Sequence, residues 1–502
     1  MLSTTKAGKA SKAGPELFFA IIAPVGTPKQ KFIDALESNL TDVGYSTVHI
    51  KLSQILAERA AKEIEDDHEE RRVGALMDAG DEVCEQAQNA AAVAFLGVAE
   101  IREYRSEQAP ANTEKDDLDK FRGRPAPRTA YVIDSLKRPV EVTRLRALWG
   151  DNLIVASLKA NHEDRHKELK QKIEKQRVIK DKKQVAVEVD HLIERDAREE
   201  GREFGQNVVK AFPLADWFID VSGDVGADVQ RFIHILFGDP ESAPAANDEF
   251  AMQAATQAAM LTPELGNRVG AVLVDSCGTV IASGANMHPI ESGTPRYDES
   301  YFNIRELVAD TMIKLKEAEQ LSDAAASNTG EDEIDNYVAQ LLLGALKDAK
   351  IRDVIEFQLP VHAEMNALLS AVRRGIQVSD CTMFVTAHPC HLCAKHLIPL
   401  DLKVVYLEPY PKSRAAAMYG DVALESFQPF TGIAPRRFES IFRVSEDRKK
   451  PDGTLKTWER KASLPKIDPF VPAGVNSREV GALESISSLF SESSTKTQGV
   501  QN

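Results

Sequence analysis

Two short motifs in the C-terminal half place metal-binding side chains at the starts of two predicted helices. The first is His362-Ala-Glu364 and the second is Pro389-Cys390-His-Leu-Cys393. Residues three apart lie on one face of a helix, so the two thiols of the second motif point the same way, and Pro389 is well suited to begin a helix. A chain that uses the imidazole and the thiols together must bring two helix N-termini to one point. This requirement constrains the fold more than any other feature of the sequence.

The residue types of the two motifs predict a catalytic zinc site. Two thiolates and one imidazole suit Zn²⁺ and leave the fourth tetrahedral position for water. Glu364 lies outside that ligand set, so its carboxylate is available to take up and deliver protons. The spacing is typical of zinc-dependent nucleobase deaminases. The alternative is a closed structural site, in which His388, His391 or His396 is the fourth ligand and Glu364 is an N-terminal helix acid.

Composition narrows the class of protein. A chain of 502 residues has room for two to four domains. Its net charge of −15 argues against a protein that coats nucleic acid with its whole surface. Five cysteines, an odd number, favour a reducing compartment over a disulfide framework. No apolar run reaches the roughly 18 residues of a membrane helix, and the first residues lack the apolar core of a secretory signal. We therefore expect a cytoplasmic protein with no membrane part.

Breaks in composition predict the domain boundaries. A stretch rich in Pro, Ala and acids, 239–249, has no periodicity and is typical of a linker. The chain becomes rich in Ser from about 477, which favours disorder. The predicted parts are a flexible tail over 1–14, a first domain over 15–240, a linker over 241–249, a second domain over 250–450, and an extension over 451–502 that is disordered from about 477.

Both halves are predicted to be α/β. In the first half, five short apolar or β-branched runs alternate with helical patterns, which indicates a doubly wound parallel sheet covered on both faces; the runs are 17–23, 46–52, 130–134, 153–158 and 216–221. In the second half, the predicted strands are 269–275, 279–286, 381–387 and 403–408, and the predicted helices include 362–374 and 390–399. A polar insertion, about 291–350, exceeds the usual loop length and is expected to carry its own helices or function.

The loop after the first strand, Ala23-Pro-Val-Gly-Thr-Pro-Lys-Gln30, resembles a phosphate-binding P-loop in altered form. Gly26, Thr27 and Lys29 fit a loop that meets a phosphate. Pro28 replaces a glycine and removes a backbone donor, and Gln30 replaces the hydroxyl that would hold Mg²⁺. We therefore expect a P-loop kinase-like domain that regulates and does not transfer phosphate.

A strongly basic stretch follows in the same domain. Between Arg165 and Lys183 there are nine Lys or Arg and three acids. One interpretation is a solvated helical face. The other is a lid or basic surface that meets nucleotide phosphates or RNA.

The order of these parts resembles the bacterial anti-phage deoxycytidine nucleotide deaminases, over about 17–445. In that family a P-loop kinase-like half is fused to a deoxycytidylate deaminase half. Besides the zinc motifs, the resemblance is carried by Ser135-Leu-Lys-Arg-Pro139, Leu192-Ile-Glu-Arg-Asp196, Arg268-Val-Gly-Ala271, Glu408-Pro-Tyr-Pro-Lys-Ser413 and Pro435-Arg-Arg437. It implies that dCTP or dCMP becomes dUTP or dUMP, which depletes dCTP during phage replication. It also implies an oligomer that is held inactive until infection, in some members by an RNA.

The segment 267–289 resembles the first hairpin of the cytidine and deoxycytidylate deaminases. By that resemblance Asn286 contacts the substrate sugar; the alternative is an Asn that only stabilises a turn. Arg268 precedes the strand and is a candidate for binding a substrate phosphate; the alternative is a solvated surface Arg. Lys412, beside a Tyr, is a third candidate for substrate binding.

Three functions are therefore weighed. The leading one is a zinc hydrolase that acts on free deoxycytidine nucleotides. The second is a deaminase of tRNA or single-stranded DNA, which needs a basic channel with aromatic platforms; aromatic residues make up only 6% of this acidic chain. The third is a non-catalytic sensor of nucleotide or RNA, against which the intact Glu364 argues.

Overall fold

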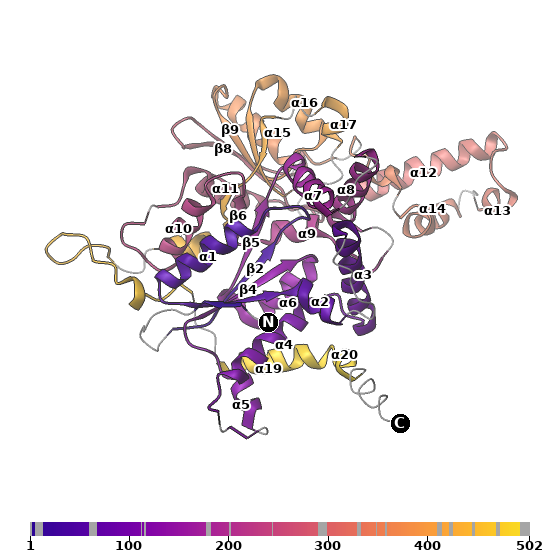
Figure 1. The fold of residues 1–502 in the computed structure, drawn as a ribbon. Coiled ribbons are helices and arrows are strands. Elements are labelled where there is room, and N and C mark those ends of the chain that lie inside the picture. Colours follow the sequence, from indigo (N-terminus) through magenta and orange to yellow (C-terminus); the bar gives the residue numbers. More distant parts are fainter. Residues whose placement is uncertain are drawn as a thin grey trace, which may run out of the picture. The chain divides into compact units, whose positions relative to one another are not determined.

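The computed structural model divides the chain into two units, the first made of residues 1–249 and 431–502 and the second of residues 250–430 (Figure 1). Each unit is built around one sheet. The structure describes residues 3–5, 14–59, 68–111, 113–114, 117–176, 182–199, 202–242, 244–289, 299–328, 333–347, 349–356, 359–408, 414–420, 425–443, 447–467 and 472–491.

A seven-stranded sheet forms the centre of the first unit. In spatial order its strands are β1 (Ser3–Thr5), β3 (Ser46–Lys51), β4 (Thr129–Leu136), β2 (Leu17–Ile22), β5 (Leu153–Lys159), β6 (Trp217–Asp220) and β12 (Gly432–Ile433). The five inner strands are parallel, and β1 and β12 pair antiparallel at the two edges. Each predicted apolar run of the first half is one of these parallel strands, which confirms the α/β class.

Helices cover both faces of this sheet (Figure 1). α1 (Gln30–Asp42) and α10 (Val225–Leu236) pack together on one face, and α4 (Ala92–Glu107) and α6 (Pro139–Trp149) pack together on the other. Trp149 stacks on Phe18 of β2 at 3.9 Å between ring centroids. The other helices of the unit are α2 (Leu52–Arg59), α3 (Glu69–Ala87), α5 (Leu118–Arg122), α7 (His162–Gln176), α8 (Lys182–Ala197), α9 (Val208–Ala211), α18 (Pro435–Phe442), α19 (Pro472–Glu484) and α20 (Ser488–Ser491).

The C-terminal part of the chain differs from its predicted assignment. Residues from 431 onward belong to the first unit, because β12 pairs with β6 and Ile433 and Ile441 are buried in its core. The segment predicted to be disordered from about 477 is helical as far as 491. Its Ser-rich composition conceals a buried helical stripe, made of Val475, Glu479, Ala482, Ile486 and Leu489.

A buried ionic contact holds that C-terminal helix in place. The Glu479 carboxylate, fully buried, accepts hydrogen bonds from Arg105 at 2.7 Å and from the indole N–H of Trp149 at 2.8 Å. Buried charges persist only when they are paired and hydrogen-bonded. The segment is therefore an integral part of the first unit.

A five-stranded sheet forms the centre of the second unit. In spatial order its strands are β11 (Phe427–Pro429), β10 (Lys403–Glu408), β9 (Thr382–Ala387), β7 (Gly270–Val274) and β8 (Val280–Ala285). β7 pairs antiparallel with both β8 and β9, whereas β9, β10 and β11 run parallel. The helices are α11 (Asn247–Ala259), which begins in the first unit, α12 (Glu299–Glu317), α13 (Asp323–Ala326), α14 (Ile334–Leu343), α15 (Ala363–Arg373), α16 (His391–Leu397) and α17 (Ala415–Tyr419).

The insertion predicted at 291–350 carries its own helices, α12 to α14, as expected (Figure 1). They bury a small core of their own, made of Ile304, Val308, Ile334, Val338 and Leu342. Across the described residues, every helix is too short or too polar to cross a lipid bilayer.

Candidate metal centre

The N-termini of α15 and α16 meet in the second unit, as the two motifs predict. His362 and Cys390 are the residues that precede these helices, and both have extended backbone angles typical of that position. The Nδ1 atom of His362 lies 3.3 Å from Sγ of Cys390 and 3.4 Å from Sγ of Cys393. The three ligand atoms all lie within 4.8 Å of one another.

This donor set fits a zinc ion. Zn–S and Zn–N bonds of about 2.3 and 2.0 Å in a tetrahedron place a sulfur and a nitrogen ligand about 3.5 Å apart, close to the two measured separations. His362, Cys390 and Cys393 are also the combination of two thiols and an imidazole that zinc prefers. Among the described residues these three form the only such cluster, so the reading of a closed site with a fourth histidine gains no support.

The three alternative histidines have other surroundings. His388 lines the cavity beside the centre, its Nδ1 lies 2.9 Å from the Pro389 carbonyl oxygen, and its ring packs edge-on against Tyr406. Nε2 of His391 lies 3.1 Å from Oε1 of Glu356. His396 belongs to the last turn of α16.

A close approach of α15 to β8 positions His362. A Cβ atom on Gly284 would lie 2.3 Å from the backbone nitrogen of Ala367 and 2.5 Å from the carbonyl oxygen of Ala363, so only glycine fits there. The Asn366 side chain donates a 2.7 Å hydrogen bond to the Ala285 carbonyl and ties the helix to the same strand. Sequence reasoning missed this support, although a glycine inside a strand pattern does signal close backbone approach.

The thiols are electrostatically unequal. Hydrogen bonds from Cys393 and then from His362 outweigh burial and lower the pKa of the Cys390 thiol to about 4. The proton shared with Cys390 raises the pKa of Cys393, and burial adds to the effect. The hydrogen bond to Cys390 also raises the pKa of His362. One thiolate is thus already favoured among the three ligands.

Glu364 lies in the first turn of α15 with only 3% of its surface exposed. Burial raises the pKa of its carboxyl group. It lines a cavity of about 390 Å³ together with His362, Cys390 and Asn286. The arrangement places a buried acid beside the ligand cluster, in a space that a small molecule can enter.

The predicted substrate-binding residues differ in whether they line this cavity. Asn286 lines the cavity, but its amide is committed to the backbone: it accepts from Val269 N–H at 2.8 Å and donates to the Asn267 carbonyl at 3.0 Å. These bonds favour the turn-stabilising interpretation. Arg268 is exposed and is not among the described residues that line the cavity. Lys412 lies outside the described residues.

A residue that sequence reasoning missed also lines this cavity. Arg352, from the short 3₁₀ helix Lys350–Asp353 that follows the insertion, faces the same space as Glu364. No local motif marks it, because its position depends on how the insertion folds.

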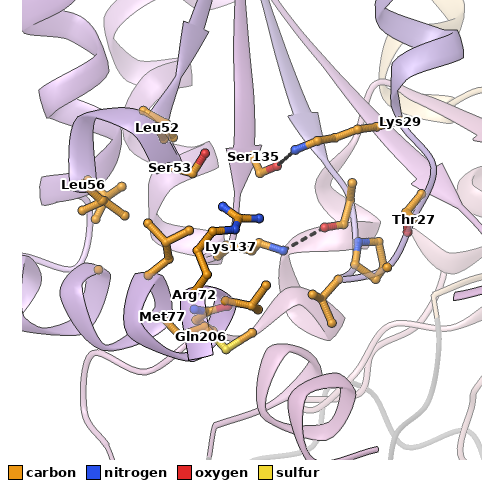
Figure 2. Close-up of a pocket in the computed structure, with 18 of the residues that line it drawn as sticks. Thr27, Lys29, Leu52, Ser53, Leu56, Arg72, Met77, Ser135, Lys137 and Gln206 are labelled. Carbon is orange, nitrogen blue, oxygen red and sulfur yellow. Dashed lines mark hydrogen bonds between the residues drawn. The ribbon is translucent and has the colours of Figure 1, made fainter. Parts of the chain in front are cut away.

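The predicted loop of the first unit borders a second cavity, of about 230 Å³, at the carboxyl ends of β2 and β4. Figure 2 shows Lys29 and Lys137 reaching toward it opposite Leu52 and Leu56. Gly26 has a φ of +82°, and Thr27 also lines the cavity.

The polar groups of this loop have partners within the chain. Lys29 Nζ lies 2.7 Å from Asp134 and 2.9 Å from Ser135. The Val25 backbone N–H donates to the buried Asp196 carboxylate at 2.7 Å, and Lys137 donates to the same carboxylate at 2.7 Å. A carboxylate of the chain thus accepts a hydrogen bond from the backbone of this loop.

The first residue of the basic stretch, Arg165, contacts this loop. The Arg165 guanidinium donates to the Val25 carbonyl at 3.0 Å. Leu169 and Ile173 of α7 are buried in a core cluster, whereas Lys167 and Lys172 are exposed, which favours the solvated-face interpretation for these two charges.

Comparison with known proteins supports the centre in the second unit. Residues 245–408 match the family described as "Cytidine and deoxycytidylate deaminase zinc-binding region". The deoxycytidylate deaminases of Enterobacteria phages T2 and T4 are each 44% identical over 55 residues, which is 11% of this chain and 29% and 28% of theirs. The chain thus matches less than a third of the length of these relatives.

Among solved structures, the dCMP deaminase from cyanophage S-TIM5 in apo form is 14% identical and aligns with 36% of this chain and 96% of its own, with a TM-score of 0.22. A likeness at that level adds nothing to the assignment. The three clustered residues His362, Cys390 and Cys393 lie within the range that the family model matches. Residues 245–408 therefore contain a zinc-binding region of the cytidine and deoxycytidylate deaminase type.

Proposed function

We propose that the second unit catalyses the zinc-dependent hydrolytic deamination of a free deoxycytidine nucleotide, dCMP or dCTP, to the deoxyuridine nucleotide. The observation that carries this proposal is one cavity that contains His362 and Cys390 of the ligand cluster beside the buried, non-ligand Glu364. A structural zinc site needs neither the cavity nor the acid.

The reaction adds water at C4 of the cytosine ring and releases the exocyclic amine as ammonia. Zinc, when bound by His362, Cys390 and Cys393, would make water a strong nucleophile near neutral pH. Glu364 would accept one proton from the attacking water and deliver it to ring N3, and would then accept the remaining proton from the new C4 hydroxyl and deliver it to the leaving amine. The buried helix ends hold His362 and the thiols in place throughout.

The cavity favours a single nucleotide over a polymer. Its volume of about 390 Å³ is in the range of small-molecule pockets. Bases of a bound strand would need stacking platforms and a row of cations, whereas the described lining includes a single Arg and no Lys. Deamination of tRNA or single-stranded DNA is therefore the second-ranked function for the same centre.

The test of the proposed function is ammonia release from dCTP, dCMP, deoxycytidine and single-stranded DNA, with zinc content measured on the same purified protein. Turnover of the free nucleotides above the other substrates supports the proposal. Turnover of the strand alone would instead establish the nucleic-acid reading. Binding of nucleotides without turnover would establish the sensor reading.

The wider role that we propose is depletion of dCTP as a defence against phage, in the cytoplasm and by an oligomer. What supports it is the resemblance to the anti-phage deaminases over both halves of the chain. Phage growth in cells that carry the active protein or its Glu364→Gln variant tests this role, since equal growth would contradict it.

For the first unit we propose a regulatory site for an anionic ligand, a nucleotide or an inhibitory RNA, at the loop that contains Gly26, Thr27 and Lys29. The supporting observation is the cavity at the carboxyl ends of parallel strands, where doubly wound sheets bind ligands. Its described lining has five cations and two acids; the cations are Lys29, Arg72, Lys137, Arg138 and Lys172, and the acids are Glu69 and Glu141. Calorimetric titration with ATP, dCTP and inorganic phosphate, on the parent and on Lys29→Ala, tests this proposal.

A further inference from the structure

The insertion helices supply one wall of the cavity that contains Glu364. Tyr301 and Ile304 come from α12, Leu342 from α14, and Arg352 from the 3₁₀ helix that follows. The rest of the lining includes the segment before β7, the residues that follow β8 and β9, and the starts of the two motif helices. The insertion is therefore part of whatever binds there.

Arg352 differs in charge from the other side chains that line this cavity. It is the only Lys or Arg among the described lining residues, whereas Glu264 and Glu364 both contribute acids. A nucleotide brings two or more negative charges on its phosphate. Without a cation in the wall, those charges would face two carboxylates at short range, which is unfavourable.

The Arg352 side chain is held so that part of its guanidinium remains available. Nη1 donates to the carbonyl oxygens of Leu342 and Lys347, each at 3.2 Å. The Leu342 carbonyl lies in the last turn of α14, where a cation is favoured by the helix dipole, and the Lys347 carbonyl lies in the turn that follows. A guanidinium has five N–H donors, and toward the described residues Nε and Nη2 make no further hydrogen bond. Those two donors have the fork geometry that binds a phosphate with two bonds.

The core of the insertion fixes the backbone next to Arg352. Ile351 packs against the buried cluster of Ile304, Val338 and Leu342. Folding of α12 and α14 therefore sets the position of residue 351, and through it the direction of the neighbouring guanidinium. The insertion therefore positions Arg352 beside the proposed catalytic centre.

We propose that Arg352 binds the 5′-phosphate of the substrate and selects nucleotides over nucleosides, and that the insertion serves to hold it in the cavity. The inference rests on the proposed deaminase function. It replaces Arg268, the phosphate ligand expected from the sequence, with a residue from a different part of the chain.

The test is steady-state kinetics of Arg352→Ala with dCMP, dCTP and deoxycytidine. A charge-assisted contact of this kind corresponds to about a 10- to 100-fold change. We expect KM for the nucleotides to rise by about that factor with kcat little changed, and the kinetics with deoxycytidine to stay as in the parent. Arg352→Lys should recover part of the loss, since it keeps the charge and loses the fork.

Arg373→Ala is the matched control, because Arg373 is exposed near the end of α15 and is not among the described lining residues. Arg268→Ala and Lys412→Ala complete the set as rival phosphate ligands. A nucleotide-specific rise in KM in either rival, with Arg352→Ala unchanged, would overturn the inference. So would an equal loss on all three substrates, which would indicate a structural role.

Failure of the proposed function has a different signature. If the parent protein deaminates none of the substrates, equilibrium binding of dCMP and deoxycytidine to the parent and to Arg352→Ala still decides the inference. Loss of dCMP binding alone supports it, and unchanged dCMP binding contradicts it.

Discussion

The two cavities of this chain differ in what their polar side chains contact. In the first unit, Lys29 is paired with Asp134, and Lys137 with Asp196. In the second unit, His362 and the thiols contact chiefly one another, and Glu364 lies beside them in the cavity. The comparison teaches that an anionic ligand of the first cavity would have to compete with carboxylates of the chain for these lysines, whereas the second unit has its metal-binding side chains already assembled. The loop that resembles a P-loop has a lysine, Lys29, but the chain itself supplies the partner of that lysine.

Removing one thiol should have the largest effect, because it destroys the centre of the second unit. Cys390→Ala and Cys393→Ala should each lose bound zinc and all deamination, since three protein ligands are the minimum for a catalytic zinc site. Metal analysis of the purified variants measures this directly. Cys277→Ser is the control, because Cys277 is an exposed turn residue and should keep its zinc. Full zinc content in a Cys390 or Cys393 variant would refute the ligand assignment.

Glu364→Gln should separate catalysis from metal binding. The carboxylate moves protons and does not coordinate, so the variant should keep one zinc per chain while kcat falls by about 10²- to 10⁴-fold. Ammonia release and metal content, measured on the same sample, give both numbers. Glu425→Gln, at an exposed position of the same unit, should behave like the parent. Activity within about threefold of the parent in Glu364→Gln would contradict its role.

Gly284→Ala should weaken the centre without touching a ligand. The added methyl would meet the backbone of α15 at 2.3 Å from the Ala367 nitrogen, and backbone cannot move aside as a side chain can. Overpacking of this kind costs about 1–3 kcal/mol. We expect a chelator to remove zinc faster and kcat to fall. Gly74→Ala in α3, where an added Cβ meets nothing within 4 Å, is the control and should be neutral or stabilising.

The sequence predicted much of the fold because its strongest signals are local. The five apolar runs of the first half and the strands around the zinc motifs are continuous, and each is bounded by turn residues or helical patterns. The zinc centre was predicted for the same reason: its residues are two short motifs whose spacing places them at helix starts. These features depend little on what lies elsewhere in the chain.

The features that the sequence did not predict depend on contacts between distant parts of the chain. Arg352 lies in no motif, and only the folded insertion brings it to the cavity. The helical segment up to 491 was missed because the Ser residues from 485 onward outweighed the buried spacing of Val475, Glu479 and Ala482. The carboxylate partners of Lys29 and Lys137 lie far away in sequence, so no local pattern showed that these two lysines are paired.

The smallest predicted effect concerns stability of the first unit and its dependence on pH. Burial of Asp134 opposes ionisation, but the neighbouring His49 side chain and hydrogen bonds from Lys29 and Ser135 outweigh it and lower the pKa of Asp134 below its ordinary value. The ionised carboxylate thus stabilises the folded state above the unfolded pKa of about 4, and that stabilisation is lost as the pH falls toward the lower folded pKa.

Lys29→Ala should lower the free energy of unfolding of the first unit by about 1 kcal/mol at neutral pH, because Lys29 is partly exposed and Asp134 keeps its other partners. All three tryptophans, Trp149, Trp217 and Trp458, belong to the first unit, so denaturation followed by tryptophan fluorescence reports on it alone. Asp134→Asn should flatten the loss of stability below about pH 4. An unchanged acid dependence in Asp134→Asn would show that this carboxylate does not couple protonation to folding. The comparison between the first cavity, whose lysines are paired within the chain, and the second cavity would then depend on the zinc centre alone.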